Sequence, residues 1–179
     1  MEFKPHNYQI SGIEHCLVHP KAALLLEMGL GKTAITLTVL NEWLYNSLEA
    51  EQVLIIAPAR IIELGTWQNE IRKWDHVQHL SFKVLNGGPE ERRKLISTKT
   101  DLTFISVDLI AWLVEELGSS WPYDTVVVDE SSKFKSAKSQ RFKSLRKVSR
   151  LYDRCLLLTG TPSPNGYEDL WSQIFLLDR

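Results

Sequence analysis

The amino-acid sequence predicts an α/β domain in which helices cover both faces of a mostly parallel β-sheet. Short apolar runs alternate along the chain with stretches of helical period, which is typical of strands joined by helical crossovers. Several apolar runs are continuous, which indicates strands buried on both faces. The 179 residues, of which 44% are hydrophobic and 24% charged, suit one globular domain, residues 1–179. The crossovers are expected to be right-handed.

The first half of the chain is expected to supply three helices separated by two strands. A stretch of helical period at Tyr8–Val18 precedes the apolar run AALLLE at Ala22–Glu27. A second helix is expected over Lys32–Tyr45, after a glycine-rich turn. The continuous run VLIIA at Val53–Ala57 is typical of a strand covered on both faces, and the helix Glu63–Trp74 follows it.

The second half repeats the same alternation with four strands and four helices. The runs LTFIS, TVVV and CLLL mark three of these strands by their continuous apolar character. The expected strands are Phe82–Leu85, Leu102–Ser106, Thr125–Val128 and Cys155–Leu158, and the expected helices are Glu90–Ile96, Leu109–Leu117, Ser139–Arg150 and Tyr167–Leu176. Ligands of such folds bind beyond the carboxyl ends of the strands, so the loops that follow strands are the places to look for a site.

Composition narrows the class of protein and its compartment. The formal net charge is −1, which does not indicate a nucleic-acid binder, although a local basic patch still binds phosphate. Cys16 and Cys155 lie among apolar residues, as expected of reduced thiols in the cytosol. No apolar run approaches membrane-spanning length, and the amino terminus lacks a signal-peptide pattern. The expected location is cytoplasmic, or associated with the nucleoid and DNA, with no membrane partner.

A glycine-rich turn after the first expected strand is the first motif that carries chemistry. Its residues are Met28, Gly29, Leu30, Gly31, Lys32 and Thr33. The glycines let successive N–H groups point inward at phosphate oxygens, and the following helix adds the positive end of its dipole. Lys32 is expected to reach the β- and γ-phosphates of ATP, and the Thr33 hydroxyl to ligate Mg²⁺. Leu26 stands where the strict motif has glycine, and the alternative is a turn with a chance Lys-Thr pair.

Two carboxylates follow the apolar strand Thr125–Val128. They belong to Asp129 and Glu130, and a buried strand that ends in such a pair indicates contact with a cation or with solvent. An acid at this position of P-loop nucleotide hydrolases holds Mg²⁺, so Asp129 is the expected metal holder. Glu130 is expected to polarise the attacking water as a general base. Taken alone the pair also fits a solvated strand end, but with the phosphate loop it indicates an ATPase-type site whose catalytic residues are Lys32, Asp129 and Glu130.

A third motif makes a resemblance specific. It runs Leu157-Leu158-Thr159-Gly160-Thr161-Pro162. With the first two motifs it resembles the amino-terminal RecA-like motor lobe of superfamily-two helicases, in the Snf-type branch of double-stranded-DNA translocases. The resemblance runs nearly end to end and includes the segment LIIAPAR followed by Trp67, Glu70 and Trp74. Trp67, like most of the tryptophans, is expected to pack rather than to stack on bases.

The resemblance implies roles for further residues. Tyr8 and Gln9 are implied to lie near the adenine of ATP, and Thr159, Gly160 and Thr161 to couple hydrolysis to DNA engagement. Arg60 and Ser106 are the implied DNA contacts. ATP and Mg²⁺ are the implied ligands, and double-stranded DNA and a second RecA-like lobe of the same full-length protein are the implied partners.

The sequence departs from the Snf-type pattern in three ways. Leu26 takes a position that is usually acidic in this branch. Ser131 and Ser132 stand where the family has a small residue and then a histidine that bridges to the coupling motif, so the strength of that coupling is in doubt. The chain stops at Arg179, before any second lobe, and that lobe supplies the arginines that complete the γ-phosphate site in this family. An isolated lobe is therefore expected to hydrolyse ATP weakly.

Basic residues crowd the segment after the acidic motif. They are Lys133, Lys135, Lys138, Arg141, Lys143, Arg146, Lys147, Arg150 and Arg154. Apolar residues recur between them at helical spacing, so one face packs while the basic residues point outward. Two interpretations stay open: contact with a nucleic-acid phosphate backbone, and a solvated helix face.

Three functions follow from these observations. The first is the ATP-binding lobe of a DNA-dependent ATPase that moves on duplex DNA. The second uses the same superfamily differently, as an RNA helicase or the motor lobe of a restriction system. The third is a nucleotide-gated binding module without a motor, which the serine pair and the missing second lobe motivate.

Overall fold

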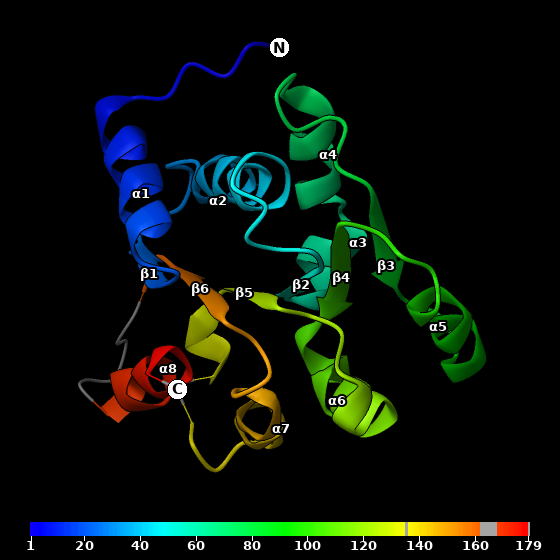
Figure 1. Ribbon diagram of the computed structural model, residues 1–179. Coiled ribbons are helices and arrows are strands. Elements are labelled where there is room, and N and C mark those ends of the chain that lie inside the picture. The colour runs from blue at the N-terminus through cyan, green and yellow to red at the C-terminus, as the bar shows by residue number, and fades with distance from the viewer. Residues whose placement is uncertain (135, 162–167, 179) are drawn as a thin grey trace.

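The protein folds around one sheet of six parallel strands. The computed structural model describes residues 1–134, 136–161 and 168–178, and the strands stand in the order β1-β6-β5-β2-β4-β3 (Figure 1). Their bounds are β1 Lys21–Leu25, β2 Val53–Ala57, β3 Phe82–Leu85, β4 Leu102–Ser106, β5 Thr125–Asp129 and β6 Arg154–Thr159. Every pairing between neighbouring strands is parallel. The predicted α/β fold with helices on both faces is confirmed, and each strand lies within one or two residues of its expected bounds.

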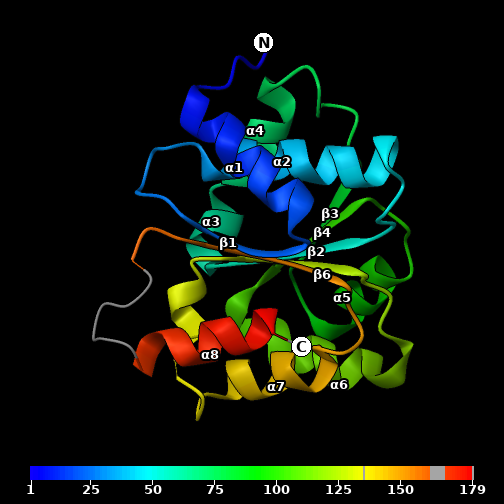
Figure 2. The ribbon, with the colours of Figure 1, turned by 60° about the vertical axis from the view of Figure 1, so that its left-hand side comes forward.

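Helices cover both faces of this sheet (Figure 2). The helices are α1 Asn7–Val18, α2 Lys32–Asn41, α3 Ala59–Glu63, α4 Thr66–Lys73, α5 Pro89–Ile96, α6 Ile110–Leu117, α7 Gln140–Val148 and α8 Glu168–Leu177. Shorter turns are the π-helix η1 Glu42–Asn46 and the 3₁₀ turns η2 Val107–Leu109, η3 Gly118–Ser120 and η4 Ser131–Phe134. Helices α1 to α4 lie on one face with the first apolar cluster, and α5 to α8 lie on the other face with the second.

The central strands explain why their apolar runs are continuous. Ile55 and Val127 pack into the cluster under α2 and α4, whereas Leu54 and Val126 pack into the cluster over α6 and α7. All five residues of β2 are buried, so neither of its faces reaches water. A strand of this kind has no polar face, which is why period-two alternation is missing from the sequence.

Two helices differ from their expected form. The stretch Glu63–Trp74 was expected as one helix, and this prediction is wrong: α3 ends at Glu63 and α4 starts at Thr66. Gly65 lies between them with φ +63°, a left-handed conformation that stops one helix and starts the next. The helix expected over Lys32–Tyr45 changes from α to π geometry at Glu42.

The carboxyl ends of the strands meet at one edge of the sheet. Leu25 of β1 stands opposite Thr159 of β6, and Asp129 of β5 stands opposite Leu158. Ala57 of β2 stands opposite Ser106 of β4. Lys32 and Asp129 follow strands that are not neighbours in the sheet, because β6 lies between β1 and β5. The coupling motif after β6 therefore separates the phosphate loop from the acidic pair.

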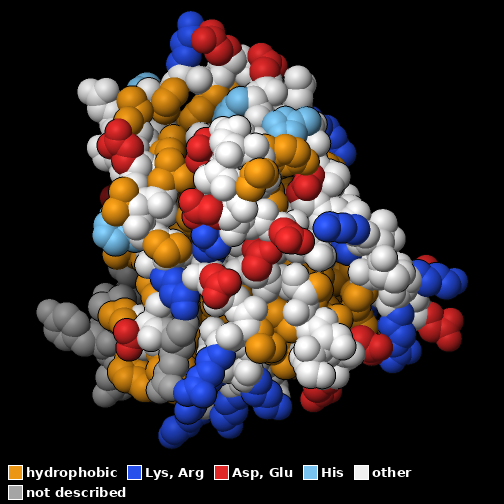
Figure 3. Space-filling view, viewed as in Figure 1, with side chains coloured by type: hydrophobic (Ala, Val, Ile, Leu, Met, Phe, Trp, Pro, Cys, Tyr) orange, Lys and Arg blue, Asp and Glu red, His pale blue; other side chains and the backbone are white. Residues whose placement is uncertain are grey.

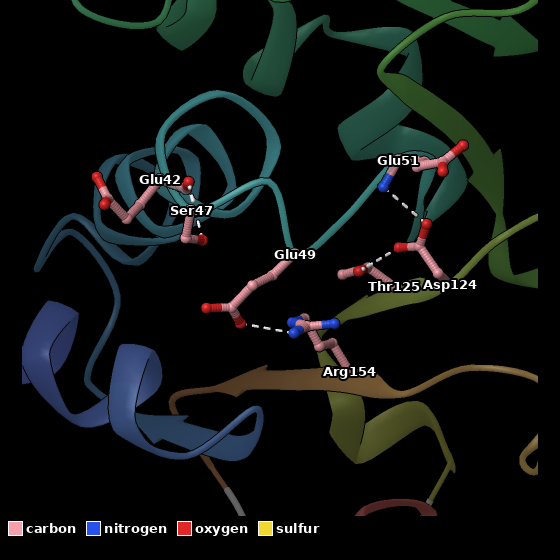
Figure 4. Close-up of polar contacts among 7 residues, drawn as sticks. All are labelled: Glu42, Ser47, Glu49, Glu51, Asp124, Thr125 and Arg154. Atoms are coloured by element: carbon pink, nitrogen blue, oxygen red, sulfur yellow. Dashed lines mark hydrogen bonds and ion pairs between the residues drawn. The ribbon is translucent and has the colours of Figure 1, made fainter.

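At the opposite edge of the sheet, where the strands begin, a group of hydrogen bonds surrounds Asp124 (Figure 4). The Asp124 carboxylate accepts hydrogen bonds from the backbone N–H groups of Glu51 and Gln52, at 2.7 and 3.1 Å, and from the Thr125 hydroxyl at 2.7 Å. Beside it, Arg154 on β6 pairs with Glu49 at 2.6 Å. These contacts fix the start of β2 against the starts of β5 and β6.

The cysteines, the lengths of the helices and the position of Tyr167 can each be compared with the sequence predictions. Cys16 and Cys155 are both free and buried, as expected of packed thiols, and burial raises the pKa of each thiol to about 12. Among the described residues, no helix combines the length and the apolar character that crossing a bilayer needs. Tyr167, the expected first residue of the last helix, lies outside the described residues.

Candidate nucleotide-binding site

The loop between β1 and α2 has the backbone geometry of a phosphate cradle. Gly29 and Gly31 have φ angles of +82° and +74°, which glycine adopts without steric cost. The loop ends at the amino terminus of α2, where Lys32 and Thr33 begin the helix and the first backbone N–H groups have no partner within the helix. Both glycines are therefore required by conformation.

The amide of Gln9 closes on this loop from α1. Its Oε1 accepts a hydrogen bond from the His6 N–H at 2.9 Å, and its Nε2 lies so close to Gly31 that a Cβ there would collide with it. Gln9 is buried, whereas Tyr8 is 42% exposed with its ring stacked on His6. The structure thus brings both sequence-predicted adenine-site residues next to the phosphate loop.

Lys32 lies folded back against its own loop. Its Nζ donates hydrogen bonds to the carbonyl oxygens of Leu26 at 2.7 Å and Glu27 at 3.0 Å. Phosphate oxygens are stronger, charged acceptors, so an entering triphosphate replaces these contacts rather than adding to them. The backbone carbonyls hold the ammonium group in position before the ligand arrives.

A pocket of about 490 Å³ opens beside the loop, a size that suits a nucleotide. Its walls come from the amino-terminal segment and α1, from the phosphate loop, and from α4. The lining residues of the first two walls include His6, Tyr8, Gln9, Gly29, Gly31, Lys32 and Thr33. The side chains of Met28 and Leu30 are not among the lining residues, and Met28 is 85% exposed, so these two residues could contribute through their backbone.

The sequence did not predict the third wall of the pocket. Thr66, Glu70, Lys73 and Trp74 of the α4 region line it. Glu70 accepts hydrogen bonds from the Trp74 indole at 2.7 Å and from Lys73 at 3.3 Å, so these side chains form one connected group. The spacing of Glu70 and Trp74 by one helical turn was the available signal, but the sequence identified these residues only as part of the Snf-type resemblance.

The acidic pair lies at the end of β5. Asp129 is partly buried, and its two oxygens have different donors: Oδ2 accepts from the Trp67 indole at 2.9 Å, and Oδ1 accepts from the Glu130 N–H at 3.0 Å. Burial raises the pKa of Asp129, while the Trp67 indole and the charge of Lys32 act against that rise. The charge of Lys32 is the smallest of the causes that act on this pKa.

Glu130 adopts an unusual backbone conformation. Its φ is +54°, in the left-handed region that residues with a Cβ seldom occupy. The conformation is held on both sides, since the Glu130 N–H donates to Asp129 and the Glu130 carbonyl accepts from the Lys133 N–H at 2.9 Å. Strained residues of this kind cluster at functional sites, which agrees with the general-base role that the sequence predicts.

The coupling motif packs directly on the phosphate loop. A Cβ placed on Gly160 would lie 3.3 Å from the Leu26 carbonyl oxygen and 3.6 Å from the Met28 nitrogen. Thr159 is buried at the end of β6, and its hydroxyl accepts a hydrogen bond from the Thr161 N–H at 3.1 Å. The close approach of the loop backbone therefore favours glycine, which has no side chain, at position 160. Pro162 lies outside the described residues.

A buried hydrogen bond links the acidic motif to α8. The Ser131 hydroxyl donates to Gln173 Oε1 at 2.6 Å, and both residues are buried. The sequence puts in doubt the coupling of ATP hydrolysis to DNA engagement, because Ser132 stands where the family has a histidine that bridges to the coupling motif. The structure shows that Ser131, the residue next to Glu130, instead connects the acidic motif to the helix that follows the coupling motif.

The two DNA-contact candidates lie farther along the same edge. Arg60 is exposed on α3, which follows β2, and Ser106 is partly buried at the end of β4. The Ser106 hydroxyl accepts a hydrogen bond from the Asp108 N–H at 3.3 Å. Neither residue lines the nucleotide pocket.

The metal site that the sequence predicts is sparse in protein ligands. Within the described residues, no group of three or more His, Cys, Asp or Glu side chains is placed to hold a metal ion. Thr33 and Asp129 supply oxygen atoms, which suit Mg²⁺, and Mg²⁺ usually takes one or two protein ligands together with phosphates and water. The residues present therefore fit a metal that arrives with a nucleotide.

Comparison with known proteins decides the family. The SNF2-related domain family matches residues 8–178, nearly the whole chain. The chain belongs to the SNF2-related family. This SNF2-related domain is similar to the SWI2/SNF2 ATPase core of Sulfolobus solfataricus, solved in complex with double-stranded DNA, with a TM-score of 0.83 and 26% identity over 99% of this chain and 36% of that chain.

Two relatives show how far the likeness extends. Protein p41 of Acyrthosiphon pisum secondary endosymbiont phage 1 is 35% identical to the SNF2-related domain over 183 residues, covering 99% of this chain and 40% of p41. The ISWI chromatin-remodeling complex ATPase ISW1 of Saccharomyces cerevisiae is 32% identical over 181 residues, covering 95% of this chain and 15% of ISW1. The SNF2-related domain therefore spans less than half the length of these relatives. The Snf-type resemblance is confirmed.

Proposed function

We propose that this SNF2-related domain is the ATP-binding lobe of a DNA-dependent ATPase that moves on duplex DNA. The observation that carries the proposal is the meeting of three motifs at one edge of the sheet, where Gly160 packs on the phosphate loop and Asp129 stands opposite Leu158, directly before the coupling motif. The resolved relative from Sulfolobus, which holds double-stranded DNA, supports duplex DNA as the partner. A second RecA-like lobe is the proposed partner for closure over the nucleotide.

Each residue of the site has a separate proposed role. Lys32 leaves the Leu26 and Glu27 carbonyls and neutralises charge on the β- and γ-phosphates, while the N–H groups of the cradle orient them. Glu130 holds and polarises the water that attacks the γ-phosphate. Mg²⁺, when bound, would be held by Thr33 and Asp129 and would neutralise phosphate charge. Ser131, through Gln173, passes any shift of the acidic motif to α8.

The chain alone is expected to bind ATP with Mg²⁺ but to hydrolyse it slowly, with or without duplex DNA. An arginine supplied by a second lobe is worth about 10³ to 10⁵ in rate, and residues 8–178 match a single SNF2-related domain. Binding is measured with a fluorescent ATP analogue and turnover by phosphate release. Rapid DNA-stimulated hydrolysis by the chain alone would contradict the expectation.

The alternatives separate in a longer protein that carries both lobes. Stimulation by duplex DNA above single strands and RNA supports the proposal. Stimulation by RNA alone points to an RNA helicase. ATP binding without hydrolysis under every condition points to a nucleotide-gated binding module. Each outcome is read from the same phosphate-release assay.

Replacing Trp67 with phenylalanine is expected to lower the apparent affinity for Mg²⁺ in the presence of ATP by about 10-fold or more. The indole N–H orients the Asp129 carboxylate, and loss of such a supporting hydrogen bond costs 10- to 100-fold in metal affinity. The loss grows as the pH falls, because without the indole donor the pKa of Asp129 rises further and protons compete with the metal at a higher pH. The apparent Mg²⁺ affinity is titrated at fixed ATP.

Trp43→Phe is the matched control for this substitution. Trp43 is as buried as Trp67, each being 1% exposed, and both belong to the same apolar cluster. The two changes therefore remove similar packing, but only Trp67 donates to Asp129. Equal losses of Mg²⁺ affinity in the two variants would show that packing, not the hydrogen bond, is responsible.

A further inference from the structure

Formal charge is strongly segregated along this chain. The segment 133–150 holds eight of the 21 Lys and Arg residues and no Asp or Glu. It therefore carries a formal charge of +8, and the rest of the chain carries −9, which together give the net charge of −1. The low net charge hides a basic segment on an otherwise acidic protein, and a basic segment of this kind dominates the local electrostatic potential.

The fold turns this segment into a surface. Helix α7 buries Phe142, Leu145 and Val148 against the second apolar cluster. Its exposed side chains include Lys143, Arg146 and Lys147, and Arg150 is exposed just beyond its end. Lys and Arg side chains gather at the lower edge of the molecule in Figure 3, where Figure 1 places α7. We call the exposed set Lys143, Arg146, Lys147 and Arg150 the α7 basic surface.

A hollow lies in this surface between α7 and α8. It measures about 270 Å³ and is lined by Arg146, Lys147, Ser149, Arg150 and Phe175. The Arg146 guanidinium stands over the Phe175 ring at 5.0 Å from its centroid, so a planar cation is already fixed at the wall of the hollow. Three cations around one concave site favour an anionic group of phosphate size.

The cations of the surface are not used up by ion pairs inside the molecule. Among the described residues, Arg141 is the member of segment 133–150 that has an ion pair, with Asp108 at 3.1 Å. On the neighbouring helix α6, the Glu116 carboxylate is engaged elsewhere, since it pairs with Arg93 at 2.7 Å. A purely solvated helix face explains exposed basic side chains, but it does not explain a concave site lined by two arginines, one lysine and an aromatic ring.

We propose that the α7 basic surface binds the phosphate backbone of duplex DNA as a second contact region, separate from Arg60 and Ser106 at the strand ends. It lies on the sheet face opposite α1, α2 and α4 (Figure 2), so DNA there does not compete with ATP. The contact is independent of base sequence and strongly dependent on salt. The choice of duplex DNA rests on the function proposed above; the phosphate-binding chemistry of the surface does not.

The double variant Arg146→Gln and Arg150→Gln tests this proposal in the chain as it stands. Duplex DNA binding is measured by fluorescence anisotropy from about 50 to 200 mM salt. Losing two phosphate contacts is expected to reduce the slope of log affinity against log salt by about 1.8, at 0.9 for each contact. Both residues are exposed, and glutamine is a good helix former, so the fold is expected to be retained.

The matched control is Lys94→Gln with Lys99→Gln. These residues are also exposed and the net charge changes equally, but they lie outside the α7 basic surface. An unchanged slope in the α7 variant, or an equal change in the control, overturns the proposal, as does wild-type protein that fails to bind duplex DNA at low salt. If Arg60→Ala lowers the slope of log affinity against log salt and the α7 variant does not, the proposed DNA-dependent function is retained. The proposal of a second contact region at α7 is then wrong.

Two further arms identify the occupant. Polyglutamate that displaces duplex DNA as well as unlabelled duplex does would show a site for acidic polypeptides and overturn the assignment to DNA. Sedimentation of the wild type and the variant at low salt detects pairing of the basic surface with the acidic remainder of a second copy. Self-association that the variant abolishes would likewise overturn it. Tighter binding of RNA than of duplex DNA contradicts the duplex.

Discussion

Lys32→Ala is expected to lower the affinity for ATP with Mg²⁺ by at least about 100-fold. Hydrogen bonds to charged groups are each worth roughly 1.5–3 kcal/mol, and Lys32 is positioned to serve two phosphates. The remaining cradle keeps its N–H groups, so the triphosphate is still recognised but its negative charge is no longer balanced. Isothermal titration calorimetry with the chain itself measures the change.

The control for this variant is Lys94→Ala, which removes an exposed lysine of α5 far from the pocket lining. Its ATP affinity should match that of the wild type. The melting temperature of Lys32→Ala should stay close to that of the wild type, because the lost resting contacts are two partly exposed bonds to the Leu26 and Glu27 carbonyls. Retained ATP affinity in Lys32→Ala would remove the basis of the proposed function.

Asp124→Ala is expected to destabilise the domain by about 2–3 kcal/mol, which lowers the melting temperature by roughly 5–10 °C for a chain of this size. The substitution leaves the N–H groups of Glu51 and Gln52 without their acceptor at the start of the central strand β2. The start of β5 also loses the hydrogen bond from the Thr125 hydroxyl to the Asp124 carboxylate (Figure 4). Differential scanning calorimetry with and without ATP separates stability from binding.

Asp153→Ala provides the comparison for Asp124→Ala. Asp153 is exposed at the same edge of the sheet, so a loss of charge without a loss of hydrogen bonds is expected to change the melting temperature little. ATP affinity at a temperature where the domain is folded should be unchanged in Asp124→Ala, because Asp124 lies at the edge opposite the nucleotide pocket. Similar melting temperatures for Asp124→Ala and the wild type would show that the hydrogen bonds of Asp124 contribute no stability.

The fold was predictable because its strands carry a signal that depends only on local sequence. A run such as Val53–Ala57 must be buried on both faces, and parallel sheets are the common way to achieve that. The phosphate loop and the acidic pair were predictable for a similar reason, since each is a contiguous motif at the end of such a strand. Their order across the sheet was not, because nothing local shows that β6 stands between β1 and β5.

The contacts that organise the site join residues far apart in sequence. Trp67 and Asp129 are 62 positions apart, and Ser131 and Gln173 are 42 apart. Such pairs depend on the direction in which side chains leave their elements after packing, which a single sequence does not specify. The break at Gly65 is a different case: glycine was visible as a helix boundary, but the apolar period across it favoured one continuous helix.

The left-handed backbone at Glu130 has a consequence for how this domain responds to selection in the laboratory. Glycine relieves the steric strain of a Cβ at φ +54°, roughly 1–2 kcal/mol for an L-residue. A screen for thermal tolerance alone would therefore favour replacing the carboxylate that we propose to activate water, which is the usual conflict between stability and turnover. Mutant libraries designed to increase the thermal stability of this domain should keep Glu130 unchanged.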